Sequence, residues 1–165
     1  MIAKKEIQKN LEQLNTRFNN SKLLREPHWY SKLAILELCG WIEVSLDDIA
    51  KTLAAKNIRK SHNLNQFDDF VSETYGFKYK NHFCKMLIQA IGITGLEKLE
   101  KLVGEKRKVQ LESELGNLAR MRDKLAHTYT RGVTLSVDAP STTIDRFHRV
   151  YEALKEYELA IRKLP

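Results

Sequence analysis

The feature that most constrains the fold is a long run of apolar residues with helical spacing in the first half of the chain. Between residues 28 and 56 these residues recur every three or four positions, which places them on one broad helical face. They are Leu33, Leu36, Leu38, Trp41, Ile42, Leu46, Ile49 and Leu53. Pro27 stands where the first turn of a helix tolerates proline. We therefore predict one long helix over about 28–56, against which the rest of the chain must pack.

Further segments with the same period predict an all-α fold. Apolar residues recur at helical spacing over residues 3–20, 81–103 and 107–128, and again over about 142–161. At 165 residues and 42% apolar composition, the chain is long enough to bury one core, and it contains no Pro-rich or Gly-rich linker. The expected architecture is a single domain over 1–165, a bundle of five sizeable helices and one short helix.

Two helix starts are predicted from polar residues with the spacing of a capping box. Asn63 with Gln66 predicts a short helix that runs to about residue 74, and Thr142 with Asp145 predicts the start of the last helix. The stretch 131–141 contains a β-leaning run that is too short to form a sheet, so we expect a loop or a small extended connection there. Core packing is expected for most of the large aromatic and sulfur side chains, including Trp29, Trp41, Phe70, Phe83, Met86 and Phe147.

The charge and cysteine content narrow the classes of function. A formal net charge of +7 favours a polyanionic partner such as nucleic acid. Arg146, His148 and Arg149 form a compact basic patch, which either contacts phosphate or is only solvated. Cys39 and Cys84 lie far apart without a C-x-x-C motif, which argues against a zinc site or a disulfide. The start of the chain lacks a signal peptide and no stretch is long and apolar enough to cross a bilayer, so we expect a cytoplasmic protein without membrane contact.

The segment with the most chemical potential is RMRDKLAHTYT, at the end of the predicted helix 107–128. Arg122 falls on a stripe otherwise filled by leucines, an unfavourable place for a guanidinium that meets neither a partner nor a ligand. One interpretation is a salt bridge at a helix interface, with His127 as a capping residue. The other is a binding or catalytic site. Glycine-rich phosphate loops and zinc-hydrolase motifs are absent from the sequence.

These residues resemble the HEPN domains, a family of small all-α proteins marked by an R-x4-H motif near the end of a late helix. Arg122, Asp123 and His127 match that motif, and Arg120 stands at an R-x6-H spacing that the looser pattern permits. Tyr129 extends the match to R-x4-H-x-Y, as in the HepT-like toxins. The string RDKLAH is also similar to the motif of HEPN proteins from abortive-infection systems.

The resemblance implies a metal-independent endoribonuclease without a cofactor, which leaves 2′,3′-cyclic phosphate ends. Arg122, His127 and Asp123 are the expected catalytic residues, and Arg120, Lys124 and Tyr129 are expected to bind substrate. Histidine can act as an acid or a base near neutral pH, and arginine binds phosphate with two donors. Because one chain supplies one motif histidine, a two-fold homodimer is expected to bring two copies of His127 and Arg122 into one cleft.

The resemblance further implies RNA as the substrate and a role as the toxin of a toxin-antitoxin or phage-defence system. The antitoxin of the HepT-like toxins is a minimal nucleotidyltransferase that adenylylates the motif tyrosine, here Tyr129. A second hypothesis is a non-catalytic HEPN-like module that binds nucleotide, RNA or a protein partner, with Arg122 and His127 as ligand or interface residues. A third is a purely structural helical adaptor.

Overall fold

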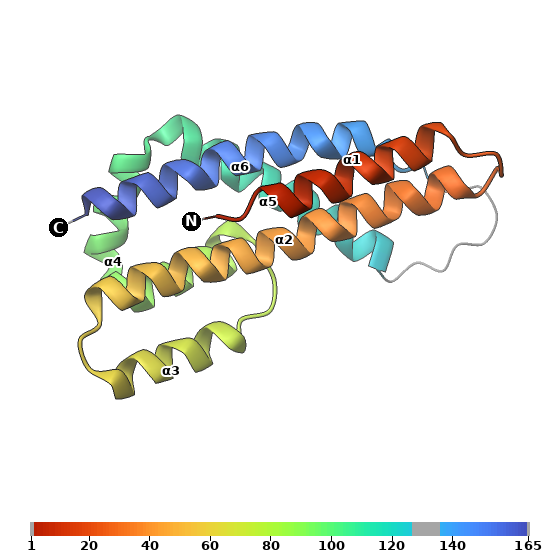
Figure 1. The fold of residues 1–165 in the computed structure, drawn as a ribbon. Coiled ribbons are helices and arrows are strands. Elements are labelled where there is room, and N and C mark those ends of the chain that lie inside the picture. Colours follow the sequence, from red (N-terminus) through yellow and green to blue (C-terminus); the bar gives the residue numbers. More distant parts are fainter. Residues whose placement is uncertain (1, 127–135, 165) are drawn as a thin grey trace.

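The regular structure of the chain is helical. A computed structural model describes residues 2–126 and 136–164, and no strand occurs within them. The helices are α1 (Lys5–Asn19), α2 (Glu26–Asn57), α3 (Ser61–Ser72), α4 (Cys84–Val103), α5 (Glu105–Ala126) and α6 (Pro140–Lys163), with a π-helical turn η1 (Tyr79–Phe83) before α4 (Figure 1). The predicted all-α bundle is confirmed. None of the helices in these two ranges is long and apolar enough to span a membrane.

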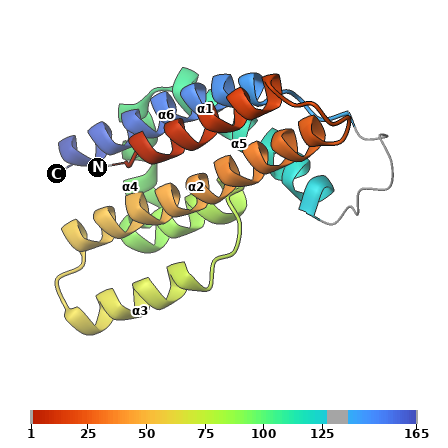
Figure 2. The same ribbon diagram turned by 45° about the vertical axis from the view of Figure 1, so that its right-hand side comes forward.

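Helix α2 is the central element of the bundle. It is 32 residues long and contacts each of the other five α-helices. Helices α1 and α6 lie along one side of α2, and α3 lies on the opposite side (Figures 1 and 2). Of the predicted apolar residues, Leu38, Ile42, Leu46, Ile49 and Leu53 are buried, whereas Leu36 and Trp41 are half-buried and Leu33 is 43% exposed. Ile35, which the predicted stripe did not include, is fully buried. The long apolar face therefore organises the fold as the sequence predicts.

Both capping boxes are wrong, because each helix begins three residues earlier than they predict. Helix α6 begins at Pro140, whose ring fixes a φ suited to the first helical turn, and Thr142 then lies inside the helix. Helix α3 begins at Ser61, so Asn63 lies within its first turn. No side-chain hydrogen bond caps the N-terminus of either helix.

Of the large side chains expected in the core, three are buried, Trp41 and Phe70 are partly buried, and Trp29 is exposed. Phe83, Met86 and Phe147 are fully buried. The Trp41 ring packs edge-on against Phe147 at a centroid distance of 5.1 Å, and its Nε1 donates to the carbonyl oxygen of Ala3 at 2.6 Å. The Trp29 side chain, on the first turns of α2, is instead 52% exposed. Trp29 therefore adds a large apolar group to the surface.

A buried polar network joins η1, α4, α5 and α6. The Tyr79 hydroxyl donates to Glu100 Oε1 at 2.7 Å and lies 2.6 Å from the Tyr157 hydroxyl. Lys108 on α5 pairs with the other oxygen of Glu100 at 3.4 Å. Burial raises the pKa of both tyrosines, so both stay protonated and able to donate. Tyr79 is therefore the centre of this network.

The network predicts an order of effects for two matched substitutions. Tyr79→Phe removes both hydrogen bonds and leaves the buried Tyr157 hydroxyl without its partner, so we expect a loss of about 2–3 kcal/mol in the free energy of unfolding. Tyr157→Phe removes one bond and leaves the bond from Tyr79 to Glu100, so we expect a loss of about 1 kcal/mol. Urea denaturation followed by circular dichroism measures both. Equal losses, or a larger loss for Tyr157→Phe, would contradict the central place of Tyr79.

Candidate functional site

Arg122 lies in the last turns of α5, and its side chain reaches the middle of α2. Its Nη1 donates to Glu43 Oε1 at 2.7 Å. Its Nε and Nη2 both donate to Asp123 Oδ1, at 3.3 and 3.1 Å. The stripe that carries Arg122 is otherwise buried, as predicted, at Leu111, Leu115, Leu118 and Leu125. The guanidinium therefore meets two carboxylates of its own chain, which fix its orientation.

An aromatic ring also packs against the same guanidinium. The Cζ atom of Arg122 lies 5.0 Å from the centroid of the Phe77 ring, a cation–π distance. Phe77 is buried, in the segment between α3 and η1. The Arg122 side chain is 30% exposed and that of Glu43 is 37% exposed, so their ion pair adds only about 1 kcal/mol to stability. The arrangement orients Arg122 more than it stabilises the fold.

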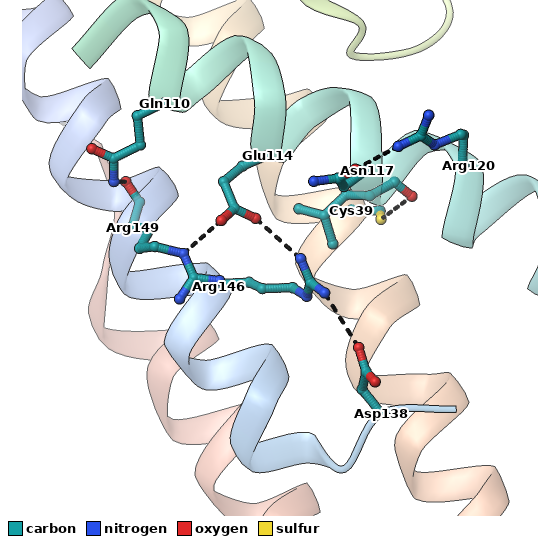
Figure 3. Close-up of polar contacts among 9 residues, drawn as sticks. Cys39, Gln110, Glu114, Asn117, Arg120, Asp138, Arg146 and Arg149 are labelled. Carbon is teal, nitrogen blue, oxygen red and sulfur yellow. Dashed lines mark hydrogen bonds and ion pairs between the residues drawn. The ribbon is translucent and has the colours of Figure 1, made fainter. Parts of the chain in front are cut away.

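The structure describes three of the other predicted site residues, and two lie outside the described ranges. Asp123 is exposed and bound to Arg122, and the exposed Arg120 donates to Asn117 Oδ1 at 2.6 Å (Figure 3). The exposed Lys124 borders a depression of about 110 Å³ between the end of α5 and residues 136–138. His127 and Tyr129 lie outside the described residues. The structure thus brings Arg122 and Asp123 together, whereas Arg120 has a separate partner.

The basic patch on α6 is largely neutralised by acidic neighbours. Glu114 of α5 accepts from Arg146 at 3.3 Å and from Arg149, and Arg146 also donates to Asp138 at 3.3 Å (Figure 3). The side chain of Arg146 is 19% exposed and that of Glu114 is 12% exposed. Of the two interpretations of the patch, these contacts favour a structural role, in which the arginines hold α6 and residue 138 against α5.

Sequence reasoning missed three residues around Arg122. Glu43 was detectable, because it is an acid in the middle of the long apolar run of α2 and could pair with an arginine on a leucine stripe. Phe77 carries no comparable signal, and His82 lies near a helix start, where capping or solvation is enough to explain a histidine. Their place depends on the course of the chain between α3 and η1, where Gly76 adopts a φ of +111°. Only the folded structure brings that segment beneath Arg122.

Burial also raises the pKa of two side chains on α2 near the Arg122 site. Burial raises the pKa of the Cys39 thiol to about 12, and its Sγ lies 4.0 Å from the carbonyl oxygen of Leu118 (Figure 3). Burial also raises the pKa of Asp47 from 3.8 to about 6, with the charge of Glu43 adding to the effect and that of Lys51 opposing it. Cys39 is therefore an inert core thiol, whereas Asp47 titrates at mildly acidic pH.

Comparisons with family models, with curated proteins and with solved structures returned no significant match to this chain. Within residues 2–126 and 136–164, no three His, Cys, Asp or Glu side chains gather closely enough to hold a metal ion. The chemistry around Arg122 is therefore the basis on which a function can be assigned.

The raised pKa of Asp47 predicts a pH-dependent effect of Asp47→Asn. Because the folded state holds the proton more tightly than the unfolded state does, ionisation of Asp47 destabilises the fold as pH rises from about 4 through 6. The neutral amide avoids this cost. We expect the variant to be more stable than the parent by about 1 kcal/mol at pH 7, allowing for partial exposure, and equally stable at pH 3.5. Urea titrations at both pH values test this, and a gain that is the same at both would refute the assignment.

Proposed function

We propose that the protein is a metal-independent endoribonuclease of HEPN type that acts as a homodimer with a composite Arg/His active site. The observation that carries the proposal is that the Arg122 side chain is held in place and yet partly exposed. Arg122 lies five positions before His127 in the sequence. The carboxylates of Glu43 and Asp123 and the ring of Phe77 fix its guanidinium, which remains 30% exposed. A fixed, accessible cation is suited to stabilise charge that develops on phosphate.

The proposed chemistry needs three functions around one phosphate of RNA. The 2′-oxygen attacks the adjacent phosphorus while the bond to the 5′-oxygen breaks, which leaves a cyclic phosphate. One His127 of the dimer accepts the proton from the 2′-hydroxyl, and the other gives a proton to the departing 5′-oxygen. Arg122 stabilises the negative charge on the phosphorane oxygens. Asp123 keeps the guanidinium in place, and Arg120, Lys124 and Tyr129 are proposed to contact the rest of the RNA.

Exposed apolar side chains support a homodimer at this end of the bundle. Leu23, Leu24, Trp29 and Leu33, in and after the connection between α1 and α2, are all at least 43% exposed. This corner lies at the same end of the bundle as the C-terminal end of α5 (Figures 1 and 2). Several large exposed apolar side chains in one short segment are typical of surfaces that a protein partner covers. A second copy that covers this corner would approach the helix end that precedes His127.

The biological role that fits this activity is that of a toxin in a toxin-antitoxin or phage-defence pair. Unrestricted cleavage of RNA would harm the cell that makes the enzyme, so an antitoxin must restrain it. A minimal nucleotidyltransferase that adenylylates Tyr129 is the proposed antitoxin, because an added nucleotide beside His127 would block the RNA phosphate from the cleft. The net charge of +7 supports association with RNA.

A second candidate function is a non-catalytic module of the same family that binds nucleotide, RNA or a protein partner. The observation that favours it is that all three donor atoms of Arg122 bond to carboxylates of its own chain. An arginine held in this way can serve an interface without taking part in chemistry.

Cleavage of RNA in excess EDTA tests the proposal. We expect the parent protein to cleave a mixed RNA substrate, and we expect His127→Ala and Arg122→Ala to lose at least about 100-fold of the rate, as removal of a proton-transfer group or a charge-stabilising donor does. Arg59→Ala is the matched control, because Arg59 is an exposed arginine between α2 and α3, at the opposite end of α2 from the proposed dimer surface. It should cleave at the parental rate.

Thermal unfolding confirms that each variant is folded before its activity is compared. Cleavage by the parent and by Arg59→Ala alone supports the enzyme. If all four proteins bind RNA but none cleaves it, the enzyme is ruled out and the binding module is favoured. Equal cleavage by all four proteins, or cleavage that EDTA abolishes, would also contradict the proposal.

A further inference from the structure

The ring of His82 is held by the segment that precedes it. Its Nδ1 accepts the backbone N–H of Lys78 at 2.9 Å. A Cβ atom at Gly76 would lie 2.9 Å from the ring Cε1 and 3.1 Å from Nε2, and Gly76 has a φ of +111°. Glycine is thus required for two reasons, its backbone conformation and the close approach of the imidazole. Residues 76–78 therefore fix the position of His82.

The same contacts fix the proton of the ring. A backbone N–H can only donate, so Nδ1 carries the lone pair and the neutral ring carries its proton on Nε2. Burial lowers the pKa of His82, and the positive charges of Lys78, Lys85 and Arg122 lower it further. At neutral pH the side chain is therefore a neutral N–H donor. It is not a proton acceptor, because its only lone pair is already bonded.

Arg122 contacts the middle residue of the same segment, Phe77. Its guanidinium lies over the ring of Phe77. In the sequence, Phe77 lies between Gly76, which contacts the His82 ring, and Lys78, whose backbone N–H bonds to that ring. Arg122 uses three of its five N–H groups on Glu43 and Asp123, and the other two have no partner within residues 2–126 and 136–164. Among the described residues, the Nε2 of His82 has no hydrogen-bond partner, and it is not among the buried unpaired atoms. The Nε2–H of His82 and the remaining N–H groups of Arg122 thus belong to two residues that both contact the segment 76–78.

We propose that the Nε2–H of His82 and the remaining N–H groups of Arg122 form a phosphate-contact site within each protomer, which binds one phosphate of the RNA backbone. The identity of the ligand rests on the proposed ribonuclease function. Phosphate oxygens only accept hydrogen bonds, and the Nε2–H of His82 and the remaining N–H groups of Arg122 only donate. The carboxylates of Glu43 and Asp123 are already bonded to Arg122. His82 is thus a binding residue, and the acid and base roles remain with His127.

Two substitutions at position 82 separate binding from structure. Asn places an oxygen near the position of Nδ1, so His82→Asn keeps the acceptor for the Lys78 N–H and removes the outer donor. Gln places an amide nitrogen near the position of Nε2, so His82→Gln keeps the outer donor and removes the acceptor. The probe is a 2′-O-methylated RNA oligonucleotide, which lacks the attacking hydroxyl and cannot be cleaved. Fluorescence anisotropy gives its Kd, and thermal unfolding gives the stability of each variant.

We expect His82→Asn to weaken binding of this RNA by about ten-fold with little change in the thermal midpoint, because a hydrogen bond to a charged group is lost. His82→Gln should bind within about two-fold of the parent and should unfold at a lower temperature. A purely structural histidine predicts the reverse order for binding. That result, or parental binding by both variants, would overturn the inference while leaving the ribonuclease proposal standing.

The inference and the proposed function can fail separately. If the parent neither cleaves nor binds RNA, the His82 ring is monitored by NMR during titration with inorganic phosphate, in the parent and in Arg122→Gln. A phosphate-dependent shift that Arg122→Gln abolishes supports the site while the ribonuclease falls. The absence of a shift in the parent overturns the phosphate site as well.

Discussion

The structure depends on the need to cover the apolar surface of α2 on several sides at once. Helices α1, α3, α4, α5 and α6 all contact it, and its inward residues are almost fully buried. The free energy gained by removing this surface from water is the largest stabilising term available to a helical domain. Because α2 is 32 residues long, the helices that cover it need not end together. This leaves helix ends, such as that of α5, beside the middle of α2.

The candidate site follows from that arrangement. Glu43 interrupts the apolar surface of α2, and Arg122 interrupts the leucine stripe of α5, so the two charges meet where the two helices pack. The segment before η1 passes beneath them and supplies the ring of Phe77. Polar side chains that a core excludes are thus gathered at one partly exposed point. A ribonuclease built here would use the packed bundle to hold its cation still before the substrate arrives.

The helical pattern, the long central helix and the position of Arg122 on a buried stripe could all be predicted, since they depend on local periodicity. The partner of Arg122 could not be assigned, because Glu43 is 79 positions away in the sequence. The capping boxes failed because Pro140 and Ser61 begin their helices earlier. Trp29 was misplaced because a stripe on a long helix does not show which turns lack a neighbour. The placement of His82 depends on Gly76 and on the packing of residues that share no periodic pattern.

The proposed catalysis needs two copies of the chain at one phosphate. The most direct measurement is the cleavage rate per chain during serial dilution, compared with the fraction of dimer measured at the same concentrations by mass photometry. The account predicts that the rate per chain falls in proportion to the dimer fraction and approaches zero for the monomer. A rate per chain that stays constant after the dimer has dissociated would contradict it.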